Sequence, residues 1–140
     1  MEIRAFNQAD TEAVVQLWND CGLTRAWNDP HKDIARKLNV SPDLFWVGVD
    51  ANGLLMASIM VGYDGHRGWI NYLAVHPSQQ RQGHARRLMQ QAEQLLTACG
   101  CPKLNLQVRA GNEAVIAFYE SLGYADDHTV SMGKRLIADH

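Results

Sequence analysis

The chain contains no long hydrophobic run. Its apolar runs are shorter than the ~20 residues that a helix needs to cross a bilayer, so we expect no membrane partner. The opening stretch, MEIRAFNQADTEAVV, has neither the basic start nor the apolar centre of a signal peptide. The sequence therefore predicts a cytoplasmic location.

The chain also has no excess of either charge. Lys and Arg total 13 against 15 for Asp and Glu, which gives a formal net charge of −2. A general nucleic-acid binder usually shows a clear basic excess. We therefore expect no nucleic-acid partner, and any basic site must be local.

Cysteine is scarce, and its three positions are Cys21, Cys99 and Cys101. An odd number of cysteines without a secretion signal is typical of reduced thiols. The CGC at 99–101 has no second Cys/His pair to complete the tetrahedral ligand set of a closed zinc site. We expect structural or incidental cysteines and no metal site.

The chain does have enough apolar sequence for one core. A length of 140 residues with 46% hydrophobic composition suits one globular domain and is short for two. No internal repeat, low-complexity tract or linker divides it. The sequence predicts a single domain over residues 1–140.

Hydrophobic periodicity predicts strands and helices along the whole chain. Two apolar runs around Asn52-Gly53 are typical of a β-hairpin. Gly100 and Pro102 end the clearest amphipathic helix, and Asn112 is a predicted N-cap of the next one. The predicted order is strand 2–6, helices 10–21 and 30–39, strands 44–50, 54–63 and 69–75, helix 85–99, strand 103–109, helix 112–123 and strand 128–137.

The predicted strands are nearly continuous in apolar residues. Such runs are typical of strands that are buried on both faces of a sheet. We expect a mixed α/β domain in which helices cover both faces of one twisted sheet.

The start of the helix at 85–99 is unusually basic. The stretch HPSQQRQGHARRL, residues 76–88, places Arg81, Arg86 and Arg87 where the helix dipole is already positive. Free backbone N–H groups at a helix start bind anions, Gly83 allows close approach, and guanidinium groups match phosphate oxygens. These features predict a phosphate site, although a solvated helix face and a loop glycine would leave the same pattern.

Two sequence blocks resemble the GNAT superfamily of N-acetyltransferases. Residues 80–85, QRQGHA, resemble its Gln/Arg-x-x-Gly-x-Gly/Ala segment, which holds the pyrophosphate of acetyl-CoA. Residues 112–124, NEAVIAFYESLGY, resemble a second block of the family, and the element order matches over essentially all 140 residues. The sequence around these blocks is similar to that of the GNAT branch that acetylates the N-termini of ribosomal proteins.

This resemblance implies a fold and an activity. The fold is a mixed, largely antiparallel twisted sheet with helices on both faces and a splayed fourth and fifth strand. The activity is acetyl transfer from acetyl-CoA to a primary amine of a protein or small molecule, by direct attack in a ternary complex. The cysteines lie outside the signature blocks, which disfavours a covalent route. The alternative is a non-catalytic regulatory module that binds CoA.

The resemblance also implies site residues. In the family, the backbone of the fourth strand binds the pantetheine arm, and a residue beyond the fifth strand, here Asn112, binds the cofactor. Asn112 is equally explained as a plain helix cap. Tyr119 resembles the general acid that protonates the leaving thiolate, the alternative being a core aromatic beside Phe118. The implied cofactor-binding residues are Leu73, Ala74, Val75, Arg81, Gln82, Gly83, His84, Ala85, Arg86 and Asn112.

The usual general base is missing. A lysine-like amine with a pKa of ~10.4 must lose a proton before it attacks. The N-terminal-acetylating branch often carries Glu on the fifth strand where this chain has Gln107, and the fourth strand offers Asn71 and Tyr72. Three explanations stay open: a water relay held by Gln107 and Asn71, an acidic group elsewhere such as Asp29 or Asp64, or an acceptor amine of low pKa.

The acceptor pocket is expected near the first two helices, beside Asn71 and Gln107. Trp27 and Asp29 are candidates for binding an ammonium group through cation–π and charge interactions. A core tryptophan and a turn aspartate before Pro30 would explain the same residues. The sequence leaves open which amine is acetylated and whether the chain forms a homodimer.

Overall fold

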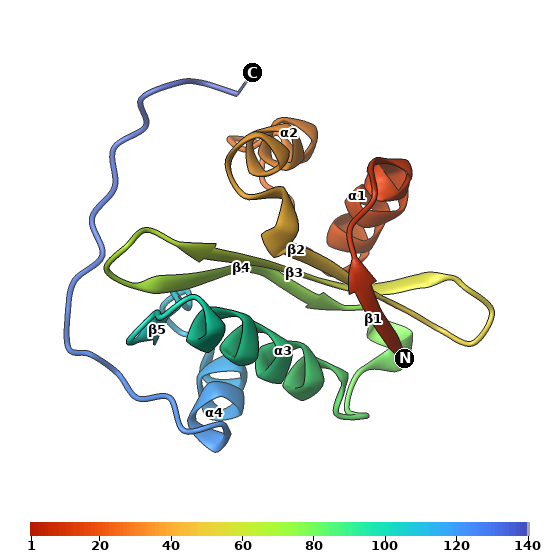
Figure 1. Ribbon diagram of the computed structural model, residues 1–140. Coiled ribbons are helices and arrows are strands. Elements are labelled where there is room, and N and C mark those ends of the chain that lie inside the picture. The colour runs from red at the N-terminus through yellow and green to blue at the C-terminus, as the bar shows by residue number, and fades with distance from the viewer. Residues whose placement is uncertain (140) are drawn as a thin grey trace.

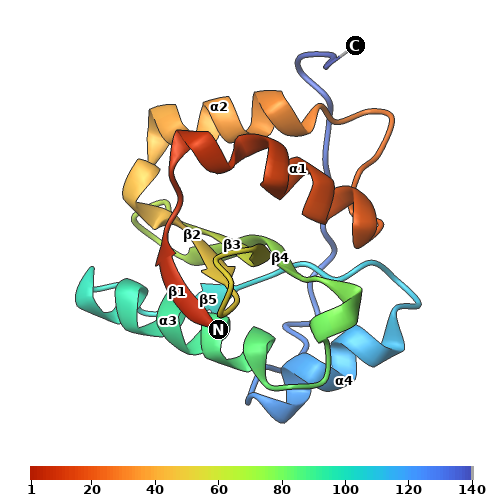
Figure 2. The ribbon, with the colours of Figure 1, turned by 90° about the vertical axis from the view of Figure 1, so that its right-hand side faces the viewer.

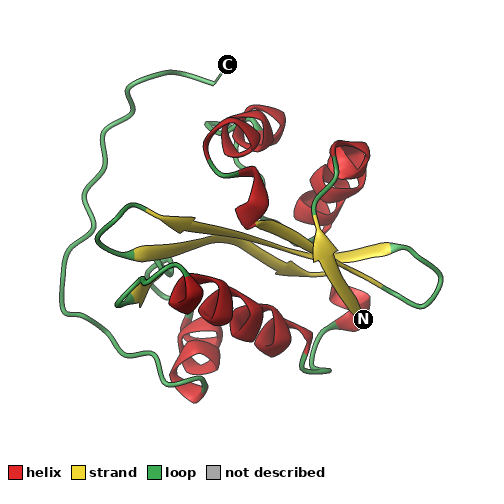
Figure 3. Ribbon diagram, in the orientation of Figure 1, coloured by secondary structure: helices red, strands yellow, loops and turns green. Residues whose placement is uncertain are grey.

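The computed structural model describes residues 1–139, which form one sheet with two layers of helices (Figures 1 and 3). Short 3₁₀ turns at Gln8–Asp10, Pro42–Leu44 and Pro77–Gln79 connect some of these elements. The elements in chain order are β1 Glu2–Ala5, α1 Thr11–Asp20, α2 Pro30–Val40, β2 Phe45–Val49, β3 Leu55–Tyr63, β4 Gly68–Val75, α3 His84–Ala98, β5 Leu104–Asn105 and α4 Glu113–Ser121.

The sheet is mixed and largely antiparallel, as predicted. Its strand order is β1-β2-β3-β4-β5. The first four strands pair antiparallel, and β4 pairs parallel with β5. The predicted hairpin between β2 and β3 is confirmed, and its Gly53 has a φ of 79° that favours glycine.

Helices cover both faces of the sheet, which confirms the prediction drawn from the apolar strands (Figures 1 and 2). On the α1/α2 face, Trp18, Phe45 and Val47 belong to one buried cluster. On the opposite face, Ile59 and Leu88 belong to a second cluster, against which α4 also packs. The central strands thus supply core side chains in both directions, as buried strands do.

The fifth strand is shorter than predicted. β4 and β5 pair only through Gly68–Leu104 and Trp69–Asn105, and the predicted strand over 103–109 ends after two residues. Leu106 still packs on the second core cluster. The alternating apolar residues of 103–109 therefore indicate which side chains are buried, and they do not indicate that the backbone pairs with a neighbouring strand. Within the described chain, the second half of β4, residues 71–75, has no partner on the β5 side, which is the expected splay.

The predicted strand over 128–137 is wrong. Residues 125–139 have no regular structure and run past the end of the sheet towards α2 (Figure 1). Val130, Met132 and Leu136 are exposed, and β5, at the edge, is too short to template another strand. An alternating pattern forms a strand only where an edge offers hydrogen-bonding partners. We call this stretch the C-terminal segment.

None of the helices in the described part of the chain is long and apolar enough to cross a bilayer.

Candidate active site

The start of α3 differs from the starts of its neighbours. Asp29 caps α2 by accepting from the backbone N of His31 at 2.9 Å and of Lys32 at 3.3 Å. Asn112 caps α4 by accepting from the N of Val115 at 3.4 Å. In contrast, α3 begins without a side-chain cap and without an acidic residue in its first turn. Its free N–H groups and positive dipole end are therefore available to an anion.

The loop before α3 has an unusual backbone. Arg81 has a φ of 64° and Gly83 a φ of 81°, both in the left-handed region. Around Gly83, an added Cβ would meet open space, so glycine is needed there for its conformation and not for lack of room. Because residues 81–83 are exposed, a ligand can reach the backbone of this turn.

Two of the three arginines are free to bind a ligand. Arg81 and Arg86 are exposed, and within residues 1–139 no hydrogen bond holds either side chain. Arg87 instead donates from Nη1 to the carbonyl oxygen of Met1 at 2.7 Å, which ties the start of β1 to α3. The structure thus separates the predicted phosphate ligands Arg81 and Arg86 from a structural arginine.

His84, the first residue of α3, carries an unsatisfied polar atom. Its Nδ1 is buried and has no hydrogen-bond partner among the described residues. Burial, together with the positive charges of the N-terminal amine and Arg87, lowers the pKa of His84. The neutral imidazole therefore leaves one ring nitrogen available beside the uncapped helix start.

The chain crosses from β4 to α3 through a braced turn. The Val75 carbonyl accepts from Gln80 Nε2 at 3.0 Å and from the Cys21 thiol at 3.3 Å. All three residues predicted to bind pantetheine, Leu73, Ala74 and Val75, belong to the stretch of β4 without a β5 neighbour, and the carbonyl of Val75 is already engaged.

Tyr119 lies on α4 with its ring against the second core cluster. The ring meets Phe118 and Tyr124 edge to face, at centroid distances of 5.1 and 5.9 Å. Burial raises the pKa of Tyr119 to about 12. Its hydroxyl makes no hydrogen bond within the described chain, so the phenol is a protonated donor that is free for a ligand.

A hollow of about 1160 Å³ lies between β5, α4 and the C-terminal segment. Both Gln107 and Tyr119 line it, so the structure brings these two predicted site residues together. Gln107 is exposed and donates from Nε2 to Ser131 Oγ at 2.5 Å. Asn71 is exposed on β4 and does not line this hollow.

The acceptor candidates on the α1–α2 loop have separate environments. Trp27 is 50% exposed, which excludes a core role, and the Arg109 guanidinium lies 6.0 Å from its ring centroid. The carboxylate of Asp29 is used in the cap of α2, so it does not point freely into a pocket. The contact of Trp27 with Arg109 joins the loop before α2 to the loop after β5.

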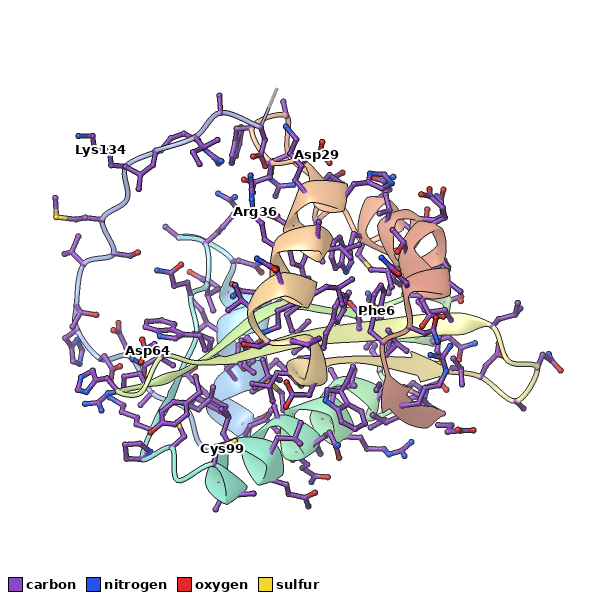
Figure 4. All side chains as sticks on the ribbon, turned by 45° about the horizontal axis from the view of Figure 1, so that its top comes forward. Phe6, Asp29, Arg36, Asp64, Cys99 and Lys134 are labelled. Carbon is purple, nitrogen blue, oxygen red and sulfur yellow. The ribbon has the colours of Figure 1, made fainter. Side chains whose placement is uncertain are left out.

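Asp64, the other acidic candidate, is fully engaged. It lies at the turn between β3 and β4, whereas Asp29 lies at the start of α2 (Figure 4). The Asp64 carboxylate accepts from the backbone N of Arg67 and of His66 and from Trp69 Nε1. These hydrogen bonds lower the pKa of Asp64 to about 2, which makes it a weak base.

The structure adds a pair that the sequence analysis missed. The Tyr72 hydroxyl on β4 donates to Asp33 Oδ2 on α2 at 2.7 Å. The Tyr72 ring stacks on Trp18 of α1, with the centroids 3.7 Å apart. These residues are far apart in sequence, and no local pattern links them. A helix-face plot would show Asp33 only as a polar residue of α2.

Cys21, Cys99 and Cys101 are free thiols. Among the residues that the structure describes, no group of three or more His, Cys, Asp or Glu side chains is arranged to hold a metal ion.

Known proteins are similar to this chain in sequence and in fold. Residues 11–124 match the family model described as the acetyltransferase (GNAT) family. An acetyltransferase of Yersinia pestis (strain Pestoides F) is 52% identical over 139 residues, which cover 99% of this chain and 98% of that protein.

Two solved structures are also similar. The ribosomal-protein-S18-alanine N-acetyltransferase from Escherichia coli has a TM-score of 0.73 and 29% identity, over 87% of this chain and 76% of that chain. The NatB acetyltransferase complex bound to CoA and MES has a TM-score of 0.78 and 24% identity, over 89% of this chain and 84% of that chain. The second likeness concerns the fold alone.

Proposed function

The chain belongs to the GNAT family of acetyltransferases, and on that premise we propose that it moves the acetyl group of acetyl-CoA to a primary amine by direct attack in a ternary complex. One observation carries the cofactor part of the proposal. The uncapped start of α3 directly follows a strand whose last residues, 71–75, have no β5 neighbour. An anion site and an open strand edge are thus adjacent, as a ligand with a pyrophosphate and an amide-containing arm requires.

The proposed cofactor contacts follow from this arrangement. The free N–H groups at the start of α3 and the two free arginines bind the pyrophosphate. The backbone of β4 beside the splay binds the pantetheine arm, and Asn112 supplies a further polar group in addition to its capping role. The proposed cofactor residues are Leu73, Ala74, Val75, Arg81, Gln82, Gly83, His84, Ala85, Arg86 and Asn112.

In the proposed reaction the neutral amine attacks the thioester carbonyl, and a C–N bond forms as the C–S bond breaks. The departing thiolate takes the proton of the Tyr119 hydroxyl, and the surplus proton of the newly bonded nitrogen passes through solvent to restore the phenol. The raised pKa of Tyr119 keeps that proton in place at neutral pH. Tyr119 is therefore proposed as the general acid.

The cysteine environment favours direct transfer over an acetyl-cysteine intermediate. Burial and the nearby Asp20 raise the pKa of Cys21, which disfavours the nucleophilic thiolate. Cys99 and Cys101 lie beyond the C-terminal end of α3, at the opposite end of that helix from the proposed pyrophosphate site.

The acceptor side is proposed to lie between the α1–α2 loop and β4. Trp27, Asp29 and Asn71 are the proposed acceptor-side residues there, and Gln107 is proposed to contact the acceptor from the hollow that it shares with Tyr119. The exposure of Trp27 and Asn71 supports this location, since an acceptor can reach both side chains. Asp29 caps α2, so its proposed role is to position the loop and not to bind the amine directly. A primary amine of a protein or a small molecule is the acceptor class.

A non-catalytic CoA-binding module is the second candidate. The neutral side chains of Gln107 and Asn71, where the family commonly carries a carboxylate, favour it.

An acceptor screen separates the two candidates. The protein is mixed with acetyl-CoA and a panel of amines that includes a peptide α-amine and a lysine side chain. Released CoA and acceptor mass are both measured. We expect CoA release matched by acetylated acceptor. Acetyl-CoA binding without CoA release for every amine would support the regulatory module.

A further inference from the structure

We propose that Tyr72 and Asp33 form the relay that takes the proton from the acceptor amine, an inference that rests on the proposed acetyl transfer. The pair joins β4 to α2 through a hydrogen bond of 2.7 Å between the Tyr72 hydroxyl and Asp33 Oδ2. It supplies a carboxylate to the acceptor side of a chain whose Gln107 and Asn71 carry none.

A bulge in β4 determines where the phenol points. Tyr72 and Leu73 together oppose the single residue Ile59 of β3, since the register shifts between Ser58 and Met60. Ile70 packs on the α3 side of the sheet and Tyr72, two residues later, on the α1/α2 side. Without the extra residue, both side chains would share one face.

The backbone at Tyr72 is strained and locked in place. Its φ of 51° is a left-handed conformation, which is unfavourable for a residue other than glycine. The Tyr72 carbonyl accepts from Ser58 Oγ at 2.8 Å, and Ser58 in turn accepts from Trp18 Nε1 at 2.9 Å. Strain that buried partners maintain is typical of functional positions.

The phenol is also adjacent to the proposed reaction centre. Leu73, the first residue proposed to bind the pantetheine arm, follows Tyr72 directly in β4. The half-buried Tyr72 ring lies against α1, on the side of the sheet where the α1–α2 loop would bind the acceptor. A phenol there is one residue from the backbone that would orient the thioester.

Charged groups around Asp33 suit a proton acceptor. Arg36 Nη1 lies 3.2 Å from Asp33 Oδ1, which leaves Oδ2 to Tyr72. Arg36 Nη2 also pairs with Asp139 Oδ1 at 2.7 Å. Asp29, one helical turn before Asp33, is used in the cap of α2. Helix α1 packs against Tyr72 through the uncharged side chain of Trp18.

The relay step is balanced in protons. The ammonium gives one proton to Tyr72 Oη while the Tyr72 hydroxyl proton passes to Asp33 Oδ2. The amine becomes neutral, the phenol is unchanged and Asp33 becomes a neutral acid that later releases its proton to water. Burial and the hydrogen bond to Asp33 raise the pKa of Tyr72, so the two transfers occur together and no tyrosinate accumulates.

The test compares Asp33→Asn with the unaltered enzyme over a range of pH. Asn keeps an oxygen that can accept from Tyr72 but cannot take the proton. With a lysine side-chain amine at pH 7, kcat/KM should fall about 100-fold. The deficit should shrink as pH rises towards the amine pKa of ~10.4, since the acceptor then loses its proton to solvent. A peptide α-amine, with a pKa of ~7.7–8.0, should show a smaller deficit.

Two further variants sharpen the comparison. Tyr72→Phe keeps the stack on Trp18 and should cause a similar loss, and the double variant should be no worse than either single one. The control is Asp50→Asn, because Asp50 Oδ1 accepts from the backbone N of Asn52 at 2.8 Å in the turn between β2 and β3, a carboxylate that neither proposed site uses. It should leave the profile unchanged.

Several results would overturn the relay. Undiminished activity of Asp33→Asn or Tyr72→Phe with the lysine amine at pH 7 would do so, as would a loss that is equal at all pH values, which indicates a structural role. Calorimetry with acetyl-CoA should give the same affinity for each variant. If the unaltered enzyme acetylates no amine, the proposed acetyl transfer itself fails and the relay fails with it.

Discussion

Tyr119 combines a partly buried ring with a hydroxyl that no side chain of the described protein holds. Burial raises its pKa to about 12, so the acid form persists through the whole range in which the protein would be assayed. For a tyrosine whose pKa is raised in the folded state, deprotonation begins above the ordinary value of ~10. An alkaline loss of activity caused by Tyr119 should therefore centre near pH 12 and not near 10.

Replacement of Tyr119 by Phe removes the acid and keeps the ring. We expect kcat to fall by about 100-fold or more, with little change in the KM for acetyl-CoA. Steady-state kinetics at saturating acetyl-CoA measures this. Tyr63→Phe, at the end of β3, is the matched control. An unchanged kcat for Tyr119→Phe would exclude the acid role.

At the scale of single residues, the sequence predicted local roles better than distant pairs. Asn112 was predicted to cap a helix from its position before an apolar pattern, and it does so. The pair Tyr72–Asp33 depends on a bulge and on the packing of α2 over β4, neither of which leaves a local pattern. Glycine, proline and helix caps affect the backbone within a few residues and can be predicted from the local sequence. The Tyr72–Asp33 pair forms only when the tertiary structure brings α2 over β4.

At the scale of elements, the contrast among helix starts is the clearest physical signal. The starts of α2 and α4 have side-chain caps and acidic residues in the first turn, and the start of α3 has neither. The sequence predicts a phosphate site at the start of α3 because charge at a helix start is visible in the residues themselves, and that site stays a prediction. Strand lengths were predicted less well, since β5 and the C-terminal segment depend on whether an edge is available for pairing.

The C-terminal segment is attached to α2 by Asp139. This carboxylate accepts from the backbone N of Asp29 at 2.8 Å and pairs with Arg36 at 2.7 Å, which together lower its pKa to about 2. Because the pKa is depressed in the folded state, the attachment is present above the ordinary value of ~3.9. It is lost as pH falls towards 2.

Asp139→Asn should release the segment from α2. We expect faster amide hydrogen exchange at Asp29, whose backbone N–H donates to the Asp139 carboxylate, while the sheet keeps its protection. Asp127→Asn is the comparison, since its exposed pair with Lys103 contributes little. Exchange that is accelerated equally by both variants would show that Asp139 is not the main attachment.

At the scale of the whole molecule, the proposed ligand bridges two parts of the fold. The β5–α4 part joins β4 through two paired positions and the second core cluster, while the proposed phosphate site lies at the start of α3. A ligand that contacts both parts stabilises the folded state in proportion to its occupancy. At a concentration of about 100 times Kd, that stabilisation is about 2.7 kcal/mol.

Acetyl-CoA should therefore raise Tm by several degrees in a thermal melt. S-acetylpantetheine, which has the arm but no pyrophosphate, should raise Tm much less at the same concentration. Equal shifts from the two ligands would contradict a phosphate site at the start of α3.

The proposed acetyl transfer is tested by following an isotope-labelled acetyl group from acetyl-CoA to an amine, for the unaltered enzyme and for Arg81→Ala and Arg86→Ala. We predict labelled acceptor in amounts that match the released CoA. Each arginine variant should raise the KM for acetyl-CoA by roughly tenfold and leave the KM for the acceptor unchanged, with Arg67→Ala as the control. Release of CoA without labelled acceptor, or an arginine effect on the acceptor alone, would contradict the account.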